Sequence, residues 1–323
     1  MFRFLFLIAS LSASAAVADV AEVVGDHILP RHQAFAQAAE DLADAANESC
    51  DAQDLVPAFQ SAYDGWMGIQ HIRVGPIEEE GRGLAISFWP DPKAMGERAQ
   101  RDLLQGDASR LQPDSFAQQS VAARGLTGLE RLLYPPQPWP ADTCQLIRAT
   151  ASDLARLADE LRDGWADGFG PLLLSAGEPK NTRFLSQAEA RQLLFTQVVT
   201  GLEYIKDQRL GRPLGSFDRP RPERAEAIAS GRSLRNVTLS LEAIREMVAA
   251  LSGEAPRTLA ALDRAIGLAE ALTDPVLAGT ANPQGRLKVE ILQQAVDAAQ
   301  QEAVAELGPA LGVTTGFNAM DGD

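Results

Sequence analysis

The feature that most constrains the fold is the spacing of apolar residues, which repeats every three to four positions over long stretches. Ser186 and Glu189 form a capping box ahead of one such run. After Ser233 the apolar positions are Leu234, Val237, Leu241, Ile244, Val248 and Leu251, which is the period of an amphipathic helix. Strand-like alternation is scarce and Asn-Gly hairpin turns are absent. The sequence therefore predicts an all-α protein.

The chain is long enough for two domains. Gly, Pro and charged residues interrupt the helical period between Gly164 and Thr182. We therefore expect two helical bundles packed against each other, one over residues 19–170 and one over residues 171–323. Asp142 is the expected cap of a helix that reaches Trp165, and further helices are expected at Val20–Ala46, Asp51–Arg73, Pro256–Leu272 and Gly285–Leu307.

The first 18 residues have the pattern of a secretory signal peptide. Arg3 is followed by an apolar run and by the small residues that precede a cleavage site after Ala18. A membrane anchor is the alternative, but the run is shorter than the roughly 20 apolar residues that span a bilayer. No later stretch reaches that length. We expect a soluble periplasmic protein without a membrane span after cleavage.

The charge balance excludes one class of partner. The formal net charge is −15, and cleavage removes Arg3 to leave −16. Such a chain repels nucleic acid and anionic membrane surfaces. We expect no nucleic-acid partner.

The two cysteines, Cys50 and Cys144, predict a disulfide. A pair of cysteines in an oxidising compartment is usually bridged. Each lies beside an aspartate that can start a helix, Asp51 or Asp142. The bridge would therefore tie two helix N-termini together.

The segment Gly125–Glu130 has half of a metal site. On a helix, positions 127 and 130 share one face. A His and a Glu there would be two metal ligands, but position 127 is Thr. Gly125 and Gly128 cost helix propensity and allow another backbone or a ligand to come close.

Only three histidines are available for a metal site. His27 and His32 are five residues apart, which separates them by about 140° on a helix, so the expected interpretation is two partly exposed side chains. His71 lies near the end of a helix with Trp66 and Arg73, before Gly75-Pro76. It could line a pocket, or it could be stabilised by the helix dipole alone. The zinc-protease HExxH, nucleophile-elbow, P-loop and Rossmann patterns are absent.

The order of several motifs resembles the imelysin-like family, which is periplasmic or surface-located, nominally metallopeptidase and linked to iron acquisition. Its hallmark GxHxxE aligns with Gly125-x-Thr127-x-x-Glu130 except at the His, as in a branch with Gly-Leu-x-x-Leu-Glu. The other matching segments are 66–76, 88–91, 231–234 and 316–323. The resemblance implies two helical bundles with the motif near their interface. It also implies that Glu130 is a metal-binding carboxylate.

We therefore expect a binding or accessory protein linked to iron or other metal uptake, with a small ligand, a metal or iron-uptake components as partners. One alternative is a metal-dependent hydrolase of imelysin type, and another is a partner-binding scaffold. A divalent metal, iron or zinc, would be held by Glu130 and His71; otherwise Glu130 is expected to be buried against Arg73, Arg124, Arg131 or Arg232. The expected site residues are Trp66, His71, Arg73, Gly125, Thr127, Gly128, Glu130, Arg232 and Ser233. No catalytic residue is assigned, and the sequence favours a protein that is not an enzyme.

Overall fold

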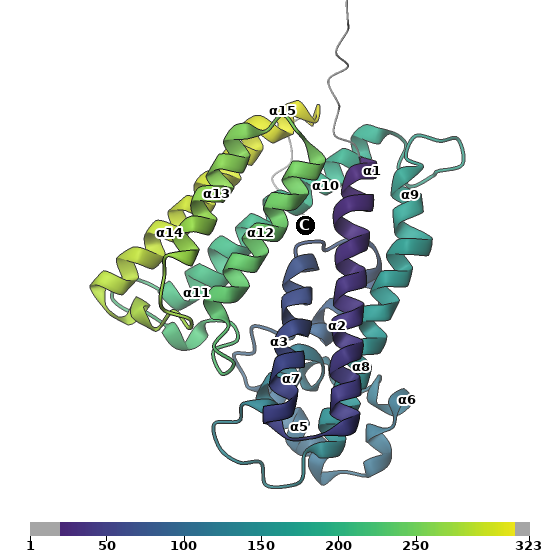
Figure 1. Ribbon diagram of the computed structural model, residues 1–323, viewed down its shortest axis with the longest axis vertical. Helices are drawn as coiled ribbons and strands as arrows, with labels where there is room; N and C mark the ends of the chain where they lie inside the picture. Colours follow the sequence, from purple (N-terminus) through teal and green to yellow (C-terminus); the bar gives the residue numbers. More distant parts are fainter. Residues whose placement is uncertain (1–19, 314–323) are drawn as a thin grey trace, which may run out of the picture.

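The computed structural model describes residues 20–313, and all its regular structure is helical (Figure 1). The signal peptide and the segment 316–323 lie outside these residues, so both remain predictions. No strand occurs within 20–313, where the one β-bridge, between Ser216 and Arg219, is isolated. The predicted all-α class is confirmed. The α-helices are α1 (Val20–Glu22), α2 (Leu29–Glu48), α3 (Ala52–Ile69), α4 (Arg82–Ile86), α5 (Met95–Gln105), α6 (Pro113–Phe116), α7 (Gly125–Leu133), α8 (Cys144–Asp163), α9 (Gly170–Leu174), α10 (Gln187–Tyr204), α11 (Gly211–Leu214), α12 (Ser233–Leu251), α13 (Pro256–Glu270), α14 (Pro283–Glu302) and α15 (Gly308–Ala310).

Shorter helices of other types connect these elements. Four π-helical segments continue an α-helix without a break, namely η1 (Val23–Ile28), η5 (Gly164–Phe169), η6 (Ile205–Leu210) and η9 (Ala303–Leu307). The 3₁₀ segments are η2 (Gly75–Gly81), η3 (Ala108–Leu111), η4 (Val121–Ala123), η7 (Pro222–Arg224) and η8 (Ala278–Ala281). Within residues 20–313, no helix has both the length and the apolar character needed to cross a membrane.

Two apolar cores organise the molecule. One is built mainly from the buried faces of α2, α3, α7 and α8. The other is built mainly from α10, α12, α13 and α14. Figure 1 shows the corresponding two groups of helices side by side, with α12 next to α3. The prediction of two helical bundles packed against each other is confirmed.

Two long helices take part in both cores. The continuous helix α1–η1–α2 contributes Val20 to Ile28 to the second core and residues from Phe35 onward to the first. The helix α8–η5–α9 behaves in the same way, because Trp165 and Phe169 belong to the second core. The division between residues 170 and 171 stays a prediction.

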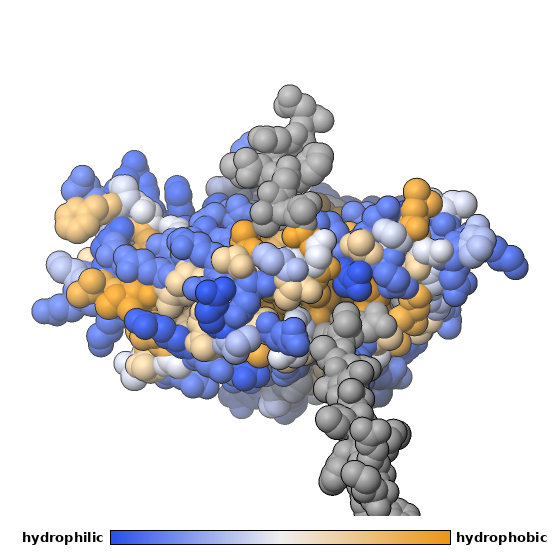
Figure 2. All heavy atoms as spheres, turned by 90° about the horizontal axis from the view of Figure 1, so that it is seen from above, coloured by the Kyte–Doolittle hydropathy of each residue, from blue (hydrophilic) through white to orange (hydrophobic). Residues whose placement is uncertain are grey.

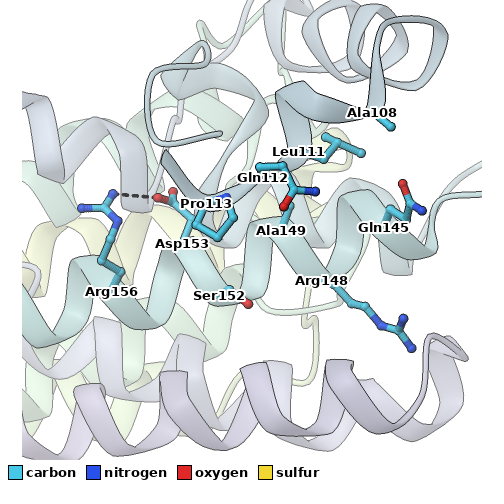
Figure 3. Close-up of a pocket in the computed structure, with 10 residues that line it drawn as sticks. All are labelled: Ala108, Leu111, Gln112, Pro113, Gln145, Arg148, Ala149, Ser152, Asp153 and Arg156. Atoms are coloured by element: carbon cyan, nitrogen blue, oxygen red, sulfur yellow. Dashed lines mark hydrogen bonds and ion pairs between the residues drawn. The ribbon is translucent and has the colours of Figure 1, made fainter. Parts of the chain in front are cut away.

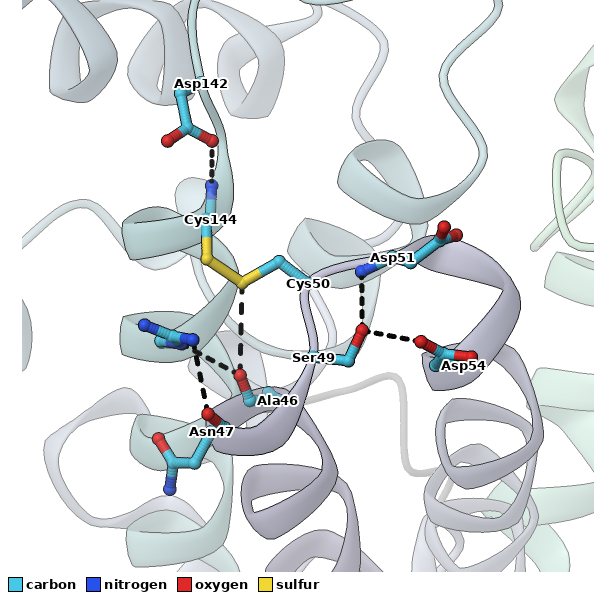
Figure 4. The surroundings of a disulfide bond; sticks show 9 residues. Ala46, Asn47, Ser49, Cys50, Asp51, Asp54, Asp142 and Cys144 are labelled. Carbon is cyan, nitrogen blue, oxygen red and sulfur yellow. Dashed lines mark hydrogen bonds between the residues drawn. A yellow bond between two sulfur atoms is a disulfide. The ribbon is translucent and has the colours of Figure 1, made fainter.

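The predicted disulfide between Cys50 and Cys144 is present (Figure 4). It joins the α2–α3 connection to the first residue of α8, with a Cα–Cα distance of 5.3 Å. Asp51 accepts a hydrogen bond from Gln53 N, and Asp142 accepts one from the backbone N of Cys144. Asp51 caps α3 as predicted. The N-cap of α8 is Thr143, so the predicted cap Asp142 lies one residue too early, although it bonds the first residue of the helix.

The predicted capping box also forms at the start of α10. Ser186 Oγ accepts a hydrogen bond from the backbone N of Glu189. The Glu189 carboxylate in turn accepts one from Leu185 N, one residue before the cap. The first bond satisfies a free N–H group of the first turn, and the second holds the backbone just before the cap.

Candidate functional site

Helix α7 carries the Gly125–Glu130 segment and begins at a glycine that no other residue could replace easily. Gly125 has φ +62°, and a Cβ there would lie 2.2 Å from Ala85 O and 2.3 Å from Ile86 O. At Gly128 a Cβ would lie 2.4 Å from Ala123 O. The first glycine thus lets α7 touch the backbone at the end of α4. This close approach fixes the position of the segment that follows α4.

Thr127 occupies the position of the missing His and makes a structural contact. Its side chain is buried, and its Oγ1 accepts a hydrogen bond of 3.2 Å from the backbone N of Phe88. The hydroxyl therefore holds the chain that leads from α4 into Trp89 and Pro90. At position 127 the side chain therefore stabilises the backbone of the segment that follows α4.

Glu130 is buried on the same helix and is held by a serine. Its Oε1 accepts hydrogen bonds from Ser230 N (2.9 Å) and Ser230 Oγ (2.6 Å). Burial raises the pKa of the Glu130 carboxyl, and the two bonds from Ser230 oppose that rise.

The expectation that an arginine pairs with Glu130 is wrong for the described residues, because each candidate has other partners. Arg124 pairs with Asp153, Arg131 donates to Gln100 and Ala122, Arg232 pairs with Asp64, and Arg73 lies over Tyr204. Hydrogen bonds from a backbone N–H and a hydroxyl stabilise the carboxylate in place of a salt bridge.

The loop that contains Ser230 makes side-chain contacts with residues near both α7 and α3. Glu226, four residues earlier, is buried and pairs with Arg209 at 2.7 Å. Arg209 also donates to Gln70 Oε1 at 2.8 Å. Gln70 directly follows α3. The loop 226–230 thus has polar contacts both to Glu130 on α7 and, through Arg209, to Gln70 at the end of α3.

A cleft of about 490 Å³ lies where these elements meet. It is bounded by the end of α3, by η2 and α4, by the segment after α4, and by the last residue of α10. Elements of both cores therefore contribute to it. Its lining residues are Trp66, Gln70, Arg73, Ile77, Glu78, Gly81, Gly83, Leu84, Ser87, Trp89, Pro90 and Tyr204.

The cleft combines aromatic rings with hydrogen-bond donors. The Arg73 guanidinium lies 4.2 Å from the centre of the Tyr204 ring, and the Trp89 ring meets the same tyrosine edge-on at 6.4 Å. Trp66 is buried, and its indole Nε1 has no hydrogen-bond partner among the described residues. A buried N–H without an acceptor costs free energy. The composition suits an organic molecule with acceptor groups.

The histidines lie beside this region, inside the protein. His27 and His32 are each 2% exposed, so the expected partial exposure is wrong. His27 Nε2 lies 3.1 Å from His71 Nε2, and His32 Nδ1 lies 2.8 Å from Ile28 O. Burial lowers the pKa of His27 to about 3 and that of His32 to about 4, and it lowers the pKa of His71 well below its usual value. All three are therefore neutral near pH 7.

The described residues do not fit a metal ion held by three protein donors. No group of three or more His, Cys, Asp or Glu side chains within residues 20–313 is arranged to hold one. His71 faces His27, whereas Glu130 faces Ser230. Metal binding by Glu130 and His71 stays a prediction.

Comparison of the chain with known proteins identifies its family. The sequence matches the imelysin family over residues 28–303. The chain belongs to the imelysin family. Its fold is similar to that of an imelysin-like protein from Psychrobacter arcticum 273-4, with a TM-score of 0.74, 19% identity, and coverage of 92% of this chain and 96% of that one.

A second solved structure is that of a "putative iron-regulated protein A precursor" from Parabacteroides distasonis ATCC 8503. It has a TM-score of 0.62 and 12% identity, and the match covers 90% of this chain and 96% of that one. None of the curated proteins matches the sequence. At these identities the two solved structures support the imelysin-like fold.

Only some of the site residues predicted for this imelysin-family chain line the cleft. Trp66 and Arg73 line the cleft, while the α7 residues and His71 lie behind its walls. Arg232 and Ser233 lie at the start of α12, where Ser233 Oγ donates to Glu226 O and Arg232 pairs with Asp64. Sequence reasoning did not single out Gln70 and Tyr204. No local pattern marks them, because each reaches the cleft through helix packing.

A second hollow of about 460 Å³ lies between α8 and the η3–α6 segment (Figure 3). Asp153 at its edge is paired with both Arg124 and Arg156. Arg148 donates to Ala46 O and Asn47 O at the end of α2. Because these charged groups are already satisfied within the imelysin-family chain, this hollow is the weaker candidate for a ligand.

Proposed function

We propose that the protein is a periplasmic binding or accessory protein whose ligand occupies the cleft between the two bundles. The observation that carries the proposal is the cleft itself, where Trp66, Arg73, Trp89 and Tyr204 line one opening and Arg73 lies over the Tyr204 ring. The lining has one arginine and one glutamate, and the Glu78 carboxylate already accepts a hydrogen bond from Gly75 N. Arg73 beside the aromatic rings therefore favours an organic ligand with an anionic group. In this proposal the α7 segment positions the cleft walls and performs no chemistry.

The proposed link to metal uptake depends on the family and on the printed name of the Parabacteroides distasonis relative. A bare ion needs several protein donors, and no group of three acidic, His or Cys side chains within residues 20–313 supplies them. We therefore propose that a metal cargo, iron in the first place, arrives inside an organic chelate. The chelate brings its own donors and presents carboxylates to Arg73.

The test is titration of the purified protein with ferric citrate, with citrate, and with Fe(II) or Zn(II) alone, followed by tryptophan fluorescence. Trp66 and Trp89 line the cleft and report occupancy. Arg73→Ala should weaken chelate binding at least tenfold, since a charge-assisted hydrogen bond is worth about 1.5–3 kcal/mol. Arg101→Ala is the matched control, because Arg101 stacks on Trp139 outside the cleft.

Other outcomes identify the alternatives. Near-stoichiometric zinc or iron in the purified protein, lost in Glu130→Ala, would support a metal-dependent hydrolase and contradict the proposal. Absence of binding to the chelate, to citrate and to the free ions would contradict it too and would favour a partner-binding scaffold. Equal affinities of the Arg73→Ala and Arg101→Ala proteins would place the ligand elsewhere.

A further inference from the structure

The end of the molecule where α14 begins has a surface unlike the rest of this acidic chain. Phe217 is 79% exposed in the turn between α11 and η7, and Leu287 is 57% exposed near the start of α14. Figure 2 shows apolar side chains protruding among hydrophilic ones at the left end, the end at which Figure 1 places the start of α14. We call Phe217, Leu287 and Ile291 with their neighbouring cations the α14 tip.

The α14 tip is a single surface, because its elements pack together. Elements α11 and η8 pack against α14, and η7 packs against both α11 and η8. The Arg286 guanidinium lies 5.7 Å from the Phe217 ring centre, and it donates to Leu214 O at 2.6 Å and to Ser216 O at 3.3 Å. This buried arginine holds the turn that presents Phe217. The exposed aromatic ring therefore stands on an ordered base.

Unpaired cations lie in the same elements as these apolar groups. Residues 211–224 contain four arginines and two carboxylates, in a chain of formal net charge −15. Of the four arginines, Arg212 lies over the Trp89 ring of the cleft and Arg221 pairs with Glu223. Arg219, Arg224 and Lys288 are exposed, and none of them has a salt-bridge partner within residues 20–313. On α14, Lys288 lies within about 100° of Leu287 and Ile291 around the helix axis. Exposed apolar side chains and unpaired cations thus lie on the same surface of the protein.

We propose that the α14 tip docks on an anionic lipid surface. A protruding aromatic ring enters the headgroup region, and the basic side chains around it bind lipid phosphates. A stable protein interface needs about 800 Å² of complementary surface on each partner, whereas the apolar part of this tip is three side chains. The charge of the remaining surface repels the same membrane, so the tip alone makes contact and the binding is reversible.

The test is flotation of the full mature protein with vesicles of phosphatidylglycerol and phosphatidylcholine, against vesicles of phosphatidylcholine alone. We expect binding only to the anionic vesicles, and weaker binding at higher salt. Loss of each cation alone should lower the partition coefficient about fivefold. The double reversal Arg219→Glu/Arg224→Glu should therefore lower it by more than about 25-fold. Phe217→Ser should lower it about tenfold.

The matched control reverses two exposed cations away from the tip, Arg98 on α5 and Lys180 after α9. The control variant carries the same net charge as the tip variant, so it should bind within twofold of the unmodified protein. Equal losses in both double variants would overturn the proposal, as would binding that ignores phosphatidylglycerol or no binding at all. A dimer that Phe217→Ser dissociates would also overturn it, because the tip would then bind a second copy of the chain.

Discussion

Replacing Gly125 by Ala tests whether α7 supports the cleft through its contact with α4. The residue needs φ +62°, a left-handed conformation that costs an L-residue about 1–2 kcal/mol. The new Cβ would also lie 2.2 Å from Ala85 O, more than 1 Å closer than ordinary contact. Relieving such a clash costs typically about 1–3 kcal/mol. We expect Gly125→Ala to lower the free energy of unfolding by about 2–5 kcal/mol.

Two other glycines separate the causes. Gly231 has φ +71° and nothing within 4 Å of its hypothetical Cβ, so Gly231→Ala should cost only the conformational term of about 1–2 kcal/mol. Gly267 is exposed within α13 and has neither a positive φ nor a close neighbour. Gly267→Ala should stabilise the protein by up to about 1 kcal/mol.

Urea denaturation followed by far-UV circular dichroism measures the three changes. The contact also predicts a functional effect, because the end of α4 leads into the cleft wall. Gly125→Ala should therefore weaken chelate binding, whereas Gly267→Ala should not change it. If Gly125→Ala costs no more stability than Gly231→Ala, the reasoning from the α4 contact is refuted.

Three further changes test other contacts. Since the folded protein keeps its histidines neutral, with the pKa of His27 lowered to about 3, the unfolded chain binds more protons below pH 6.5. Stability should be fully present above pH 6.5 and fall below it by up to about 1.4 kcal/mol per pH unit for each histidine, and His71→Gln should reduce that slope in urea titrations. Reducing the Cys50–Cys144 bridge should cost at most about 4.7 kcal/mol, and alkylation of the unreduced protein should add no label by intact mass; two labels would contradict the bridge. Asp153→Ala leaves the buried Arg124 without its carboxylate, while Arg156 keeps Glu160, and it should cost about 3–5 kcal/mol by denaturation. A loss below about 1 kcal/mol would show that the Arg124–Asp153 pair is solvated.

The sequence predicted those parts of the fold that depend on local pattern. Apolar spacing after Ser233 predicted α12, and Ser186 with Glu189 predicted the start of α10. The disulfide was predictable because it required only the compartment and an even number of cysteines. In each case the physical cause acts over a few residues or through composition.

The partners of buried polar groups could not be predicted in this way. Glu130 and Ser230 are 100 residues apart, and His27 meets His71 across 44 residues. The five-residue spacing of His27 and His32 describes one helix and contains no information about the helices that cover it. An arginine partner for Glu130 was reasonable from charge alone, but packing brought a serine hydroxyl and a backbone N–H instead.

The two long helices that take part in both cores have a mechanical consequence. Helix α1–η1–α2 and helix α8–η5–α9 each pass from one bundle into the other without a break in the helix. A hinge between the bundles would have to bend both helices at once and break their backbone hydrogen bonds. The two bundles therefore keep a fixed spacing, and the cleft between them keeps its width. If the proposed ligand binds there, its affinity depends on how well it fits an opening of constant width.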